Sequence, residues 1–237
     1  DKVGFSWLIG GAQGTGIERG ASIFIYTIAS AGYYIFGKRE YYSNIMGEHS
    51  YFYVRIDNKP IHSHIERFHL LASYDAETVF KHSLEGIEGG AIIYNVAFSN
   101  TKVTDIPTIE ERLKHDIIQR LRSKNYGITL NDVLKECLER DIISIPIDYN
   151  EILNKVANKT GEKLGELTRL NNVIAVSASL ALLGVDINLL YKNIERTFKY
   201  RKKVIEPNIF AAEYTYDYIN SLGYRNKFKH RLPNPIN

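Results

Sequence analysis

The first fifty residues place a glycine-rich turn between a buried strand and an apolar helix. Val3–Ile9 is a short apolar run that leads into the sequence GGAQGTG at residues 10–16. In Ile17–Ala31 the apolar residues then repeat at helical spacing, and Gly32 ends the segment. A strand that feeds a glycine turn and a helix leaves backbone N–H groups free at the helix N-terminus, where an anion can bind. The chain is therefore expected to open an α/β sheet of the nucleotide-binding type.

The spacing of the glycines argues against two nucleotide motifs. A dinucleotide fingerprint has the order G-x-G-x-x-G and an acidic residue after the second strand. This chain instead has Gly11-x-x-Gly14-x-Gly16, and Lys38-Arg39 follow the second apolar run. A Walker loop needs Lys and Ser or Thr after its last glycine, where Ile17-Glu18 stand. Two interpretations stay open, a structural turn with glycines at positive φ and an anion site.

Two basic residues follow the expected second strand, Tyr33–Phe36. Lys38 and Arg39 at its carboxyl end suit a phosphate carried on a ribose, as in NADP or coenzyme A. The alternative is a solvated basic turn, which is common after strands. The candidate cofactor-binding residues, for coenzyme A or another anion, are Gly11, Gly14, Thr15, Gly16, Lys38 and Arg39.

Apolar runs continue along the first hundred residues and predict further strands. These expected strands are Ser50–Asp57, Phe68–Ser73 and Ala91–Val96, with a short crossover at Ala76–Ser83. Alternation of strands and helices predicts an α/β fold with a mostly parallel sheet flanked by helices.

The second half is richer in amphipathic helices. Pro107–Arg140 contains two of them, Ile109–Ser123 and Leu130–Arg140, the latter with Thr129 or Asn131 as its cap. This segment predicts an inserted helical subdomain. A strand (Ile142–Ile147) and four helices are expected next: Asn150–Lys159, Asn171–Leu183, Ile187–Phe198 and Pro207–Leu222, the last with proline in its first turn. The basic, proline-containing end, Gly223–Asn237, is typical of a linker.

Composition restricts the chemistry that this chain carries. Cys137 is the only cysteine, so an intrachain disulfide and a four-cysteine iron–sulfur cluster are excluded. The formal net charge of +3 gives no support for nucleic acid, and no apolar run approaches the roughly 20 residues of a membrane span. No signal-peptide pattern opens the chain, so a cytoplasmic protein is expected.

Histidines and tyrosines give two further patterns. His62, His64 and Glu66 with His69 are the one metal-like cluster, but their geometry depends on an unknown turn, so no metal site is predicted. The aromatic stretch Tyr41–Tyr53 favours a protein–protein docking face over a nucleic-acid surface. Neither a Ser–His–Asp arrangement nor paired carboxylates can be recognised, so no catalytic residue is assigned.

Several of these segments together resemble the γ domain of the 2-oxoacid:ferredoxin oxidoreductases. The similar segments are the glycine loop, Gly32–Gly37, Arg39–Gly47, Asp75–Glu77, Gly89–Gly90, Asn171–Val173, Ser177–Gly184 and Tyr191–Phe198. The resemblance covers about residues 1–100 and 165–222. Ala12 stands where many members of the family have glycine, and Pro107–Arg140 is longer than in compact versions of the domain.

The resemblance implies part of an enzyme that oxidatively decarboxylates a 2-oxoacid, with coenzyme A as co-substrate and ferredoxin as acceptor. Thiamine diphosphate, magnesium and an iron–sulfur cluster are implied on partner domains, which are an α domain and a β subunit. Residues 1–222 are expected to form the γ-type domain, with an insertion at 107–140, and residues 223–237 to lead towards an α domain. The role implied for this region is structural, with possible cover of coenzyme A. The alternatives are an NADP-binding reductase domain and a non-catalytic subunit-interaction module.

Overall fold

A computed structural model describes residues 4–44, 47–61 and 67–236. Within them, six strands form one sheet in the order β2-β3-β1-β4-β5-β6. The strands are β1 (Phe5–Ala12), β2 (Tyr34–Asn44), β3 (Gly47–Asp57), β4 (Phe68–Ala72), β5 (Gly86–Asn95) and β6 (Ile143–Ile147). β1, β4, β5 and β6 pair in parallel, whereas β3 is antiparallel to both β1 and β2. The predicted α/β fold with a mostly parallel sheet is confirmed.

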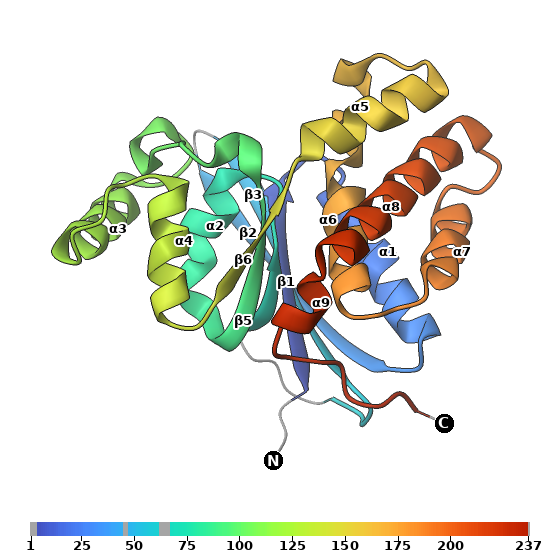
Figure 1. The fold of residues 1–237 in the computed structure, drawn as a ribbon, viewed down its shortest axis with the longest axis horizontal. Helices are drawn as coiled ribbons and strands as arrows, with labels where there is room; N and C mark the ends of the chain where they lie inside the picture. The colour runs from blue at the N-terminus through green and yellow to red at the C-terminus, as the bar shows by residue number, and fades with distance from the viewer. Residues whose placement is uncertain (1–3, 45–46, 62–66, 237) are drawn as a thin grey trace.

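Helices cover both faces of this sheet (Figure 1). One face carries α1 (Ile17–Ser30), α6 (Asn171–Leu182), α7 (Ile187–Thr197) and α8 (Lys202–Leu222). The other carries α2 (Ala76–His82), α3 (Glu111–Ser123) and α4 (Leu130–Glu139). The helix α5 (Tyr149–Thr160) follows β6 and packs against α8, and the short α9 (Tyr224–Lys227) follows α8. In the part of the chain that the structure describes, no helix is long and apolar enough to span a membrane.

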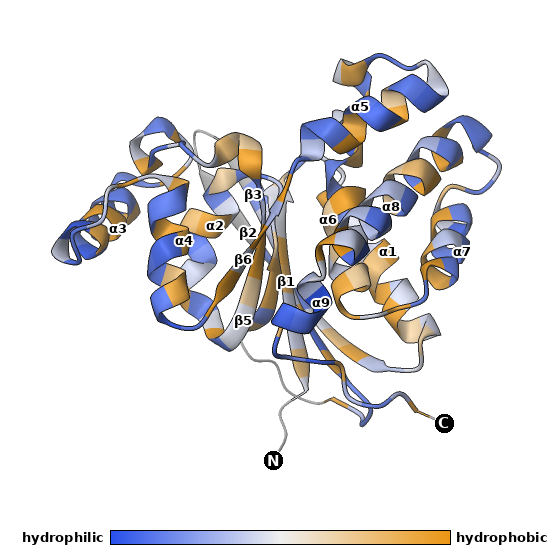
Figure 2. Cartoon of the chain, in the orientation of Figure 1, coloured by the Kyte–Doolittle hydropathy of each residue, from blue (hydrophilic) through white to orange (hydrophobic). Residues whose placement is uncertain are grey.

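Two hydrophobic cores result from this layered arrangement, one on each face of the sheet. Apolar residues concentrate on the strands and on the inward sides of the helices (Figure 2). The core under α1 and α6 includes Trp7, whose indole stacks on Phe24 at 3.6 Å and donates a hydrogen bond to Ser179 at 3.0 Å. These contacts fasten β1, α1 and α6 together and fix the direction in which α1 leaves the sheet.

The segment expected as a helical insertion, 107–140, forms α3 and α4 between β5 and β6. The helix α4 contacts α2 and β6, so the segment completes one face of the domain. The fully buried carboxylate of Glu136 on α4 accepts hydrogen bonds at 3.1 and 3.2 Å from Arg120 Nε on α3. A buried carboxylate is stable only when it is paired, so this pair ties α3 to α4.

Several predicted element boundaries are wrong: β1 continues past Ile9 to Ala12, and β5 begins at Gly86 rather than at Ala91. The second strand, predicted at Tyr33–Phe36, does not end at Phe36 but continues to Asn44, because β2 and β3 pair along their whole length. The last long helix does not begin at Pro207 but at Lys202, since Val204 and Ile205 pack against the core and extend it. Pro207 lies inside α8, where it removes one backbone hydrogen bond near the helix start.

The docking face predicted for Tyr41–Tyr53 is wrong for its last tyrosines. Tyr51 and Tyr53 are buried in the core under α2. The Tyr53 hydroxyl donates a hydrogen bond to Glu85 at 2.6 Å. Alternation along β3 explains the error, because every second side chain faces the interior and the opposite face is also covered by helices.

The last residues, expected as a linker over 223–237, lie against the domain. Phe228 is buried and meets Phe5 edge-on, with ring centroids 6.1 Å apart. The backbone carbonyl of Pro233 accepts a hydrogen bond from the Tyr33 hydroxyl at 2.7 Å, and Ile236 N donates to Gly32 O at 2.8 Å. A role as a link to a following domain stays a prediction.

Candidate anion-binding site

The glycine loop, residues 13–16, joins the carboxyl end of β1 to the start of α1. Gly14 and Gly16 have φ values of 85° and 83°, in the left-handed region that glycine adopts without strain. Gly16 is the N-cap residue of α1, and no side chain caps the helix there. The first turn of α1 therefore offers backbone N–H groups to an acceptor outside the helix.

Three side chains behind the loop hold it in this shape. Thr15 Oγ1 lies 2.8 Å from the Tyr74 hydroxyl and donates to Ala12 O at 2.5 Å. Asn172 Nδ2, at the start of α6, donates to Thr15 O at 3.1 Å. A Cβ on Gly11 would lie 1.9 Å from the Tyr74 hydroxyl, so glycine is needed there for Tyr74 to approach. Gly11 and Thr15 thus support the loop from behind.

A hollow of about 890 Å³ opens on the other side of the loop, between α1 and the end of α7. We call it the basic hollow. It is lined by Gln13, Gly14, Gly16, Ile17, Glu18, Arg19, Ser22, Tyr26, Arg196, Thr197 and Lys199.

The two arginines of the hollow lie over aromatic rings. The Arg19 guanidinium lies 5.3 Å from the ring centre of Phe198, and that of Arg196 lies 4.7 Å from the ring centre of Tyr26. Across residues 4–44, 47–61 and 67–236, no carboxylate lies within 4.0 Å of Arg19, Arg196 or Lys199. Cations that rest on ring faces without a carboxylate partner are available to an anionic ligand.

The structure separates the predicted Lys38–Arg39 pair. Alternate residues of a strand point to opposite faces, so Arg39 faces α1 whereas Lys38 faces away from it. Arg39 pairs with Glu18 at the edge of the basic hollow and lies over the ring of Phe52 at 5.3 Å. Lys38 pairs with Glu40 at 2.9 Å. Both basic residues lie inside β2, so the prediction that they end a strand is wrong.

A second pocket, of about 440 Å³, lies beside the same loop; we call it the polar pocket. Its lining includes Thr15, Tyr74, His49 and Asp75. It lies between β1, which leads to α1 on one face, and β4, which leads to α2 on the other. Such a change of direction opens a crevice at the carboxyl ends of parallel strands, where α/β proteins bind ligands.

An ion-pair group forms part of the polar pocket. His49 Nε2 lies 3.2 Å from Asp75 Oδ2, and His49 Nδ1 lies 2.5 Å from Glu77 Oε2. Burial alone would lower the pKa of His49, but the hydrogen bonds and charges of Asp75 and Glu77 raise it to about 9. Burial opposes ionisation of Glu77, yet hydrogen bonds from His49 and Thr108 hold its pKa below the usual value. His49 is therefore an imidazolium at neutral pH.

The metal-like cluster lies mostly outside the described residues, because His62, His64 and Glu66 are among those without a description. His69 is buried, and its Nδ1 accepts a hydrogen bond from Ser6 N at 2.8 Å. Burial, with a smaller effect of His230, lowers the pKa of His69 to about 4. No group of three or more metal-ligating side chains occurs among the residues that the structure describes.

The structure thus brings Gly14 and Gly16 to the basic hollow, places Arg39 at its edge through Glu18, and places Gly11 and Thr15 behind the loop. The sequence reasoning missed Arg19, Arg196, Lys199 and His49. Arg196 and Lys199 lie far along the chain from the loop, and no local motif predicts that they approach it. The one local sequence signal near His49 is Asp75, an N-cap residue type at the start of α2. Its carboxylate accepts a hydrogen bond from Thr78 N at 2.9 Å.

A mostly parallel sheet flanked by helices, with a glycine loop at the start of its first helix, defines the class of this protein as an α/β domain. The chain belongs to the pyruvate ferredoxin/flavodoxin oxidoreductase family, whose family profile matches residues 6–218. This match confirms the resemblance predicted from the glycine loop and its companion segments.

The chain is similar to the alpha subunits of 2-oxoacid:ferredoxin oxidoreductases. It is 41% identical to subunit alpha of oxidoreductase 1 from Sulfurisphaera tokodaii, over 91% of this chain and 34% of that one. It is also 41% identical to the alpha subunit from Saccharolobus solfataricus, over 88% of this chain and 33% of that one. The chain therefore spans about a third of the length of the curated relatives that it matches.

Solved structures share the fold at low sequence identity. A 2-oxoglutarate:ferredoxin oxidoreductase from Magnetococcus marinus, with 2-oxoglutarate, coenzyme A and succinyl-CoA bound, matches with a TM-score of 0.67 at 16% identity. That match covers 99% of this chain and 34% of the other. The gamma subunit of a keto/oxoacid ferredoxin oxidoreductase from Geobacter sulfurreducens matches with a TM-score of 0.60 at 17% identity, over 92% of this chain and 97% of that one.

Proposed function

We propose that residues 1–222 of this chain form the γ-type region of a 2-oxoacid:ferredoxin oxidoreductase, and that the region belongs to a longer subunit. That enzyme would decarboxylate a 2-oxoacid oxidatively, pass the acyl group to coenzyme A and reduce ferredoxin. The names and lengths of the relatives support this proposal. Thiamine diphosphate, magnesium and an iron–sulfur cluster would be held by partner domains, because cofactors of this kind supply the difficult chemistry. In this region we assign binding residues and no catalytic residue.

The observation that carries the proposal is the basic hollow. Coenzyme A has a diphosphate and a ribose phosphate, so its nucleotide end needs several cations and backbone N–H donors. Arg19, Arg196 and Lys199 line a hollow that begins at the uncapped start of α1. Arginine side chains and helix N-termini are both suited to phosphate oxygens.

Three of the predicted residues have a role in the proposed site, and Lys38 has none. Gly14 and Gly16 let the ligand approach the backbone, because they carry no Cβ. Arg39 would act at the edge of the hollow, through its pair with Glu18. Lys38 lies on the opposite face of β2 and is left out of the proposed site.

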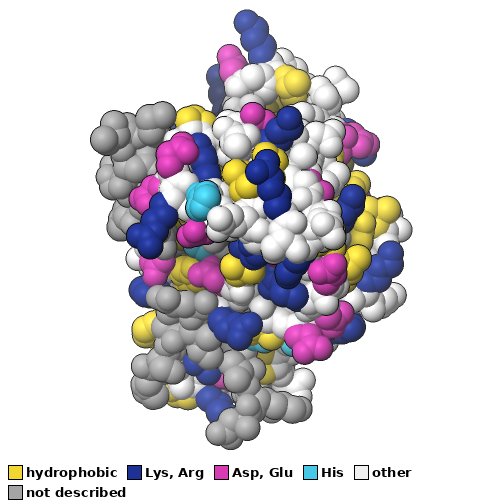
Figure 3. All heavy atoms as spheres, turned by 90° about the vertical axis from the view of Figure 1, so that its left-hand side faces the viewer, with side chains coloured by type: hydrophobic (Ala, Val, Ile, Leu, Met, Phe, Trp, Pro, Cys, Tyr) yellow, Lys and Arg dark blue, Asp and Glu magenta, His cyan; other side chains and the backbone are white. Residues whose placement is uncertain are grey.

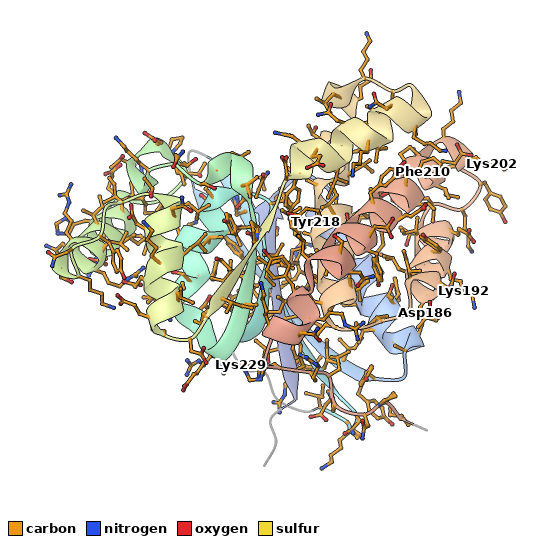
Figure 4. The ribbon with its side chains drawn as sticks, viewed as in Figure 1. Asp186, Lys192, Lys202, Phe210, Tyr218 and Lys229 are labelled. Carbon is orange, nitrogen blue, oxygen red and sulfur yellow. The ribbon has the colours of Figure 1, made fainter. Side chains whose placement is uncertain are left out.

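Reversal of one charge in the hollow tests the coenzyme A role. In the enzyme assembled with its partner chains, Arg196→Glu should raise the KM for coenzyme A on the order of tenfold or more, since a hydrogen bond to a charged group contributes roughly 1.5–3 kcal/mol. Reaction of the 2-oxoacid with the enzyme in the absence of coenzyme A should stay unchanged. The matched control is Lys192→Glu, one turn earlier on α7 and outside the hollow; Lys192 is labelled in Figure 4.

Two results would refute the coenzyme A role. The first is an unchanged KM in Arg196→Glu and Arg39→Glu, which would leave the region a scaffold. The second is tight binding of NADP by the wild-type enzyme that is lost in Arg196→Glu, which would assign the hollow to the alternative NADP-binding reductase domain. A KM increase in Lys38→Glu equal to that in Arg39→Glu would show that the effect is not local.

A further inference from the structure

The turn between α7 and α8 carries a concentrated positive charge. Four of the five residues 199–203 are Lys or Arg, and none is acidic. The rest of the sequence has 26 Lys and Arg against 27 Asp and Glu, so this basic turn accounts for the whole positive excess of the chain. By contrast, charges of both signs are interspersed on the side of the molecule that carries α3 and α4 (Figure 3).

The centre of the basic turn is a tyrosine that points into solvent. Tyr200 is 98% exposed, the most exposed of the large hydrophobic residues in the described part of the chain. Its neighbour Phe198 is buried, and Phe198 O accepts a hydrogen bond from Arg201 N at 3.0 Å. The hydrogen bond therefore closes the turn around Tyr200, and the exposure of Tyr200 shows that its ring lies in solvent rather than in a pocket.

Folding alone does not account for these residues. Arg201 is the N-cap residue of α8 without a side-chain cap, and Lys202 and Lys203 occupy the first turn. Cations at a helix N-terminus oppose the helix dipole, and Tyr200 has a φ of 65°, which costs free energy in a residue other than glycine. Among residues 4–44, 47–61 and 67–236, no carboxylate lies within 4.0 Å of Arg201, Lys202 or Lys203. Lys202 lies at the outer end of α8 (Figure 4).

We propose that the basic turn docks into an acidic surface on another polypeptide chain of the assembled enzyme, with Tyr200 as the central contact. This inference rests on the proposed function only in assuming such an assembly. Tyrosine and arginine are enriched at the centres of protein interfaces, and complementary charge around them selects the partner. A polynucleotide would need several aromatic residues along a groove, and a membrane would need an apolar face; the turn has one exposed ring.

Photo-crosslinking from the turn identifies what covers it. A benzoylphenylalanine at position 200 of the assembled enzyme should form a crosslink to another chain, in a peptide where Asp and Glu outnumber Lys and Arg. The same probe in place of Leu138, which is 62% exposed on α4, is the positional control. A missing crosslink from position 200, or one to the same chain, would overturn the proposal.

Charge reversal gives an independent measurement of the same contact. Lys202→Glu with Lys203→Glu should weaken association of the partner chain on the order of tenfold at low salt, and less at high salt. The unfolding midpoint should not fall, because Glu is favoured in a first helical turn. Arg112→Glu with Arg122→Glu on α3 makes the same change of charge and should leave association unchanged.

The readouts separate this proposal from the coenzyme A role. If the Lys202→Glu, Lys203→Glu variant has an unchanged KM for coenzyme A and a weaker association with its partner chain, the result supports docking. This holds whether or not Arg196→Glu changes the KM for coenzyme A. Equal association of both double variants would contradict docking. Binding of phosphatidylglycerol vesicles or of a single-stranded oligothymidylate that is lost in the Lys202–Lys203 variant would assign the turn to a membrane or a polynucleotide instead.

Discussion

At the scale of single residues, His49 is a buried group whose charge makes stability depend on pH. It lies on β3, opposite Ala12 at the start of the glycine loop, and it links that strand to Asp75 and Glu77 of α2. The imidazolium pairs with the partly exposed carboxylate of Asp75 and with the buried carboxylate of Glu77, and an unpaired charge at the Glu77 position would be costly. His49 thus connects the antiparallel side of the sheet to the carboxyl edge where the polar pocket opens.

The raised pKa of His49 predicts a loss of stability at alkaline pH. Its pKa is about 9 in the folded chain and 6.5 for a histidine in the unfolded chain, so its contribution is fully present below pH 6.5. That contribution, of the order of 3 kcal/mol, is lost as the pH rises through about 9. Unfolding in urea between pH 6 and pH 10 measures it. His49→Gln should flatten this part of the profile, and a wild-type profile without such a decline would contradict the assignment.

The local sequence predicts the glycine loop but not the cations that face it. Gly14 and Gly16 can be predicted as part of a loop, because glycine adopts φ near 85° without strain, whereas Gly10 and Gly11 belong to β1. The position of the cations beside the loop cannot be predicted from local sequence, since Arg196 and Lys199 lie at the end of α7, far along the chain. The ring contacts of Arg19 with Phe198 and of Arg196 with Tyr26 exist only after the helices have packed.

At the scale of elements, the cap of α4 shows how the structure settles an alternative that the sequence leaves open. Thr129 and Asn131 are both candidates from the sequence. The structure has Thr129 as the N-cap, in a capping box with Asp132: the Asp132 carboxylate accepts from Thr129 N at 3.0 Å, and Asp132 N donates to Thr129 Oγ1 at 3.3 Å. Reciprocal bonds of this kind satisfy two otherwise free N–H groups.

The capping box predicts unequal effects of two neighbouring substitutions. Thr129→Ala should lower the free energy of unfolding by about 1 kcal/mol, because the first turn of α4 loses a hydrogen-bond acceptor. Asn131→Ala, two residues later, should change it by much less, since its side chain is not the cap. Chemical denaturation of both variants measures the difference. Equal losses would mean that Thr129 is not the decisive cap.

Element boundaries are predicted best where local signals end a segment. The helix predicted at Ile17–Ala31 is observed at Ile17–Ser30, because glycines stand on both sides. The second strand is predicted far too short, since its outer half is polar and its pairing with β3 is a tertiary property. The start of α8 is missed for a related reason, as packing of Val204 extends the helix before Pro207.

At the scale of the whole molecule, the order of strands determines where ligands meet the fold. Alternating strands and helices predict a mostly parallel sheet, but not the order β2-β3-β1-β4-β5-β6. That order places β1 beside β4, so the basic hollow and the polar pocket open on either side of one loop. Strand order depends on long-range pairing, which short-range periodicity does not encode.

The assignment of the basic hollow to coenzyme A is tested by the equilibrium dissociation constant of coenzyme A for the assembled enzyme, measured without 2-oxoacid at two salt concentrations. Arg19→Glu with Arg196→Glu should raise this constant on the order of a hundredfold, since two charge-assisted contacts are lost. The salt dependence of binding should also become weaker in that variant, because fewer cations face the phosphates. A constant equal to that of the wild-type enzyme at both salt concentrations would contradict the assignment of the basic hollow.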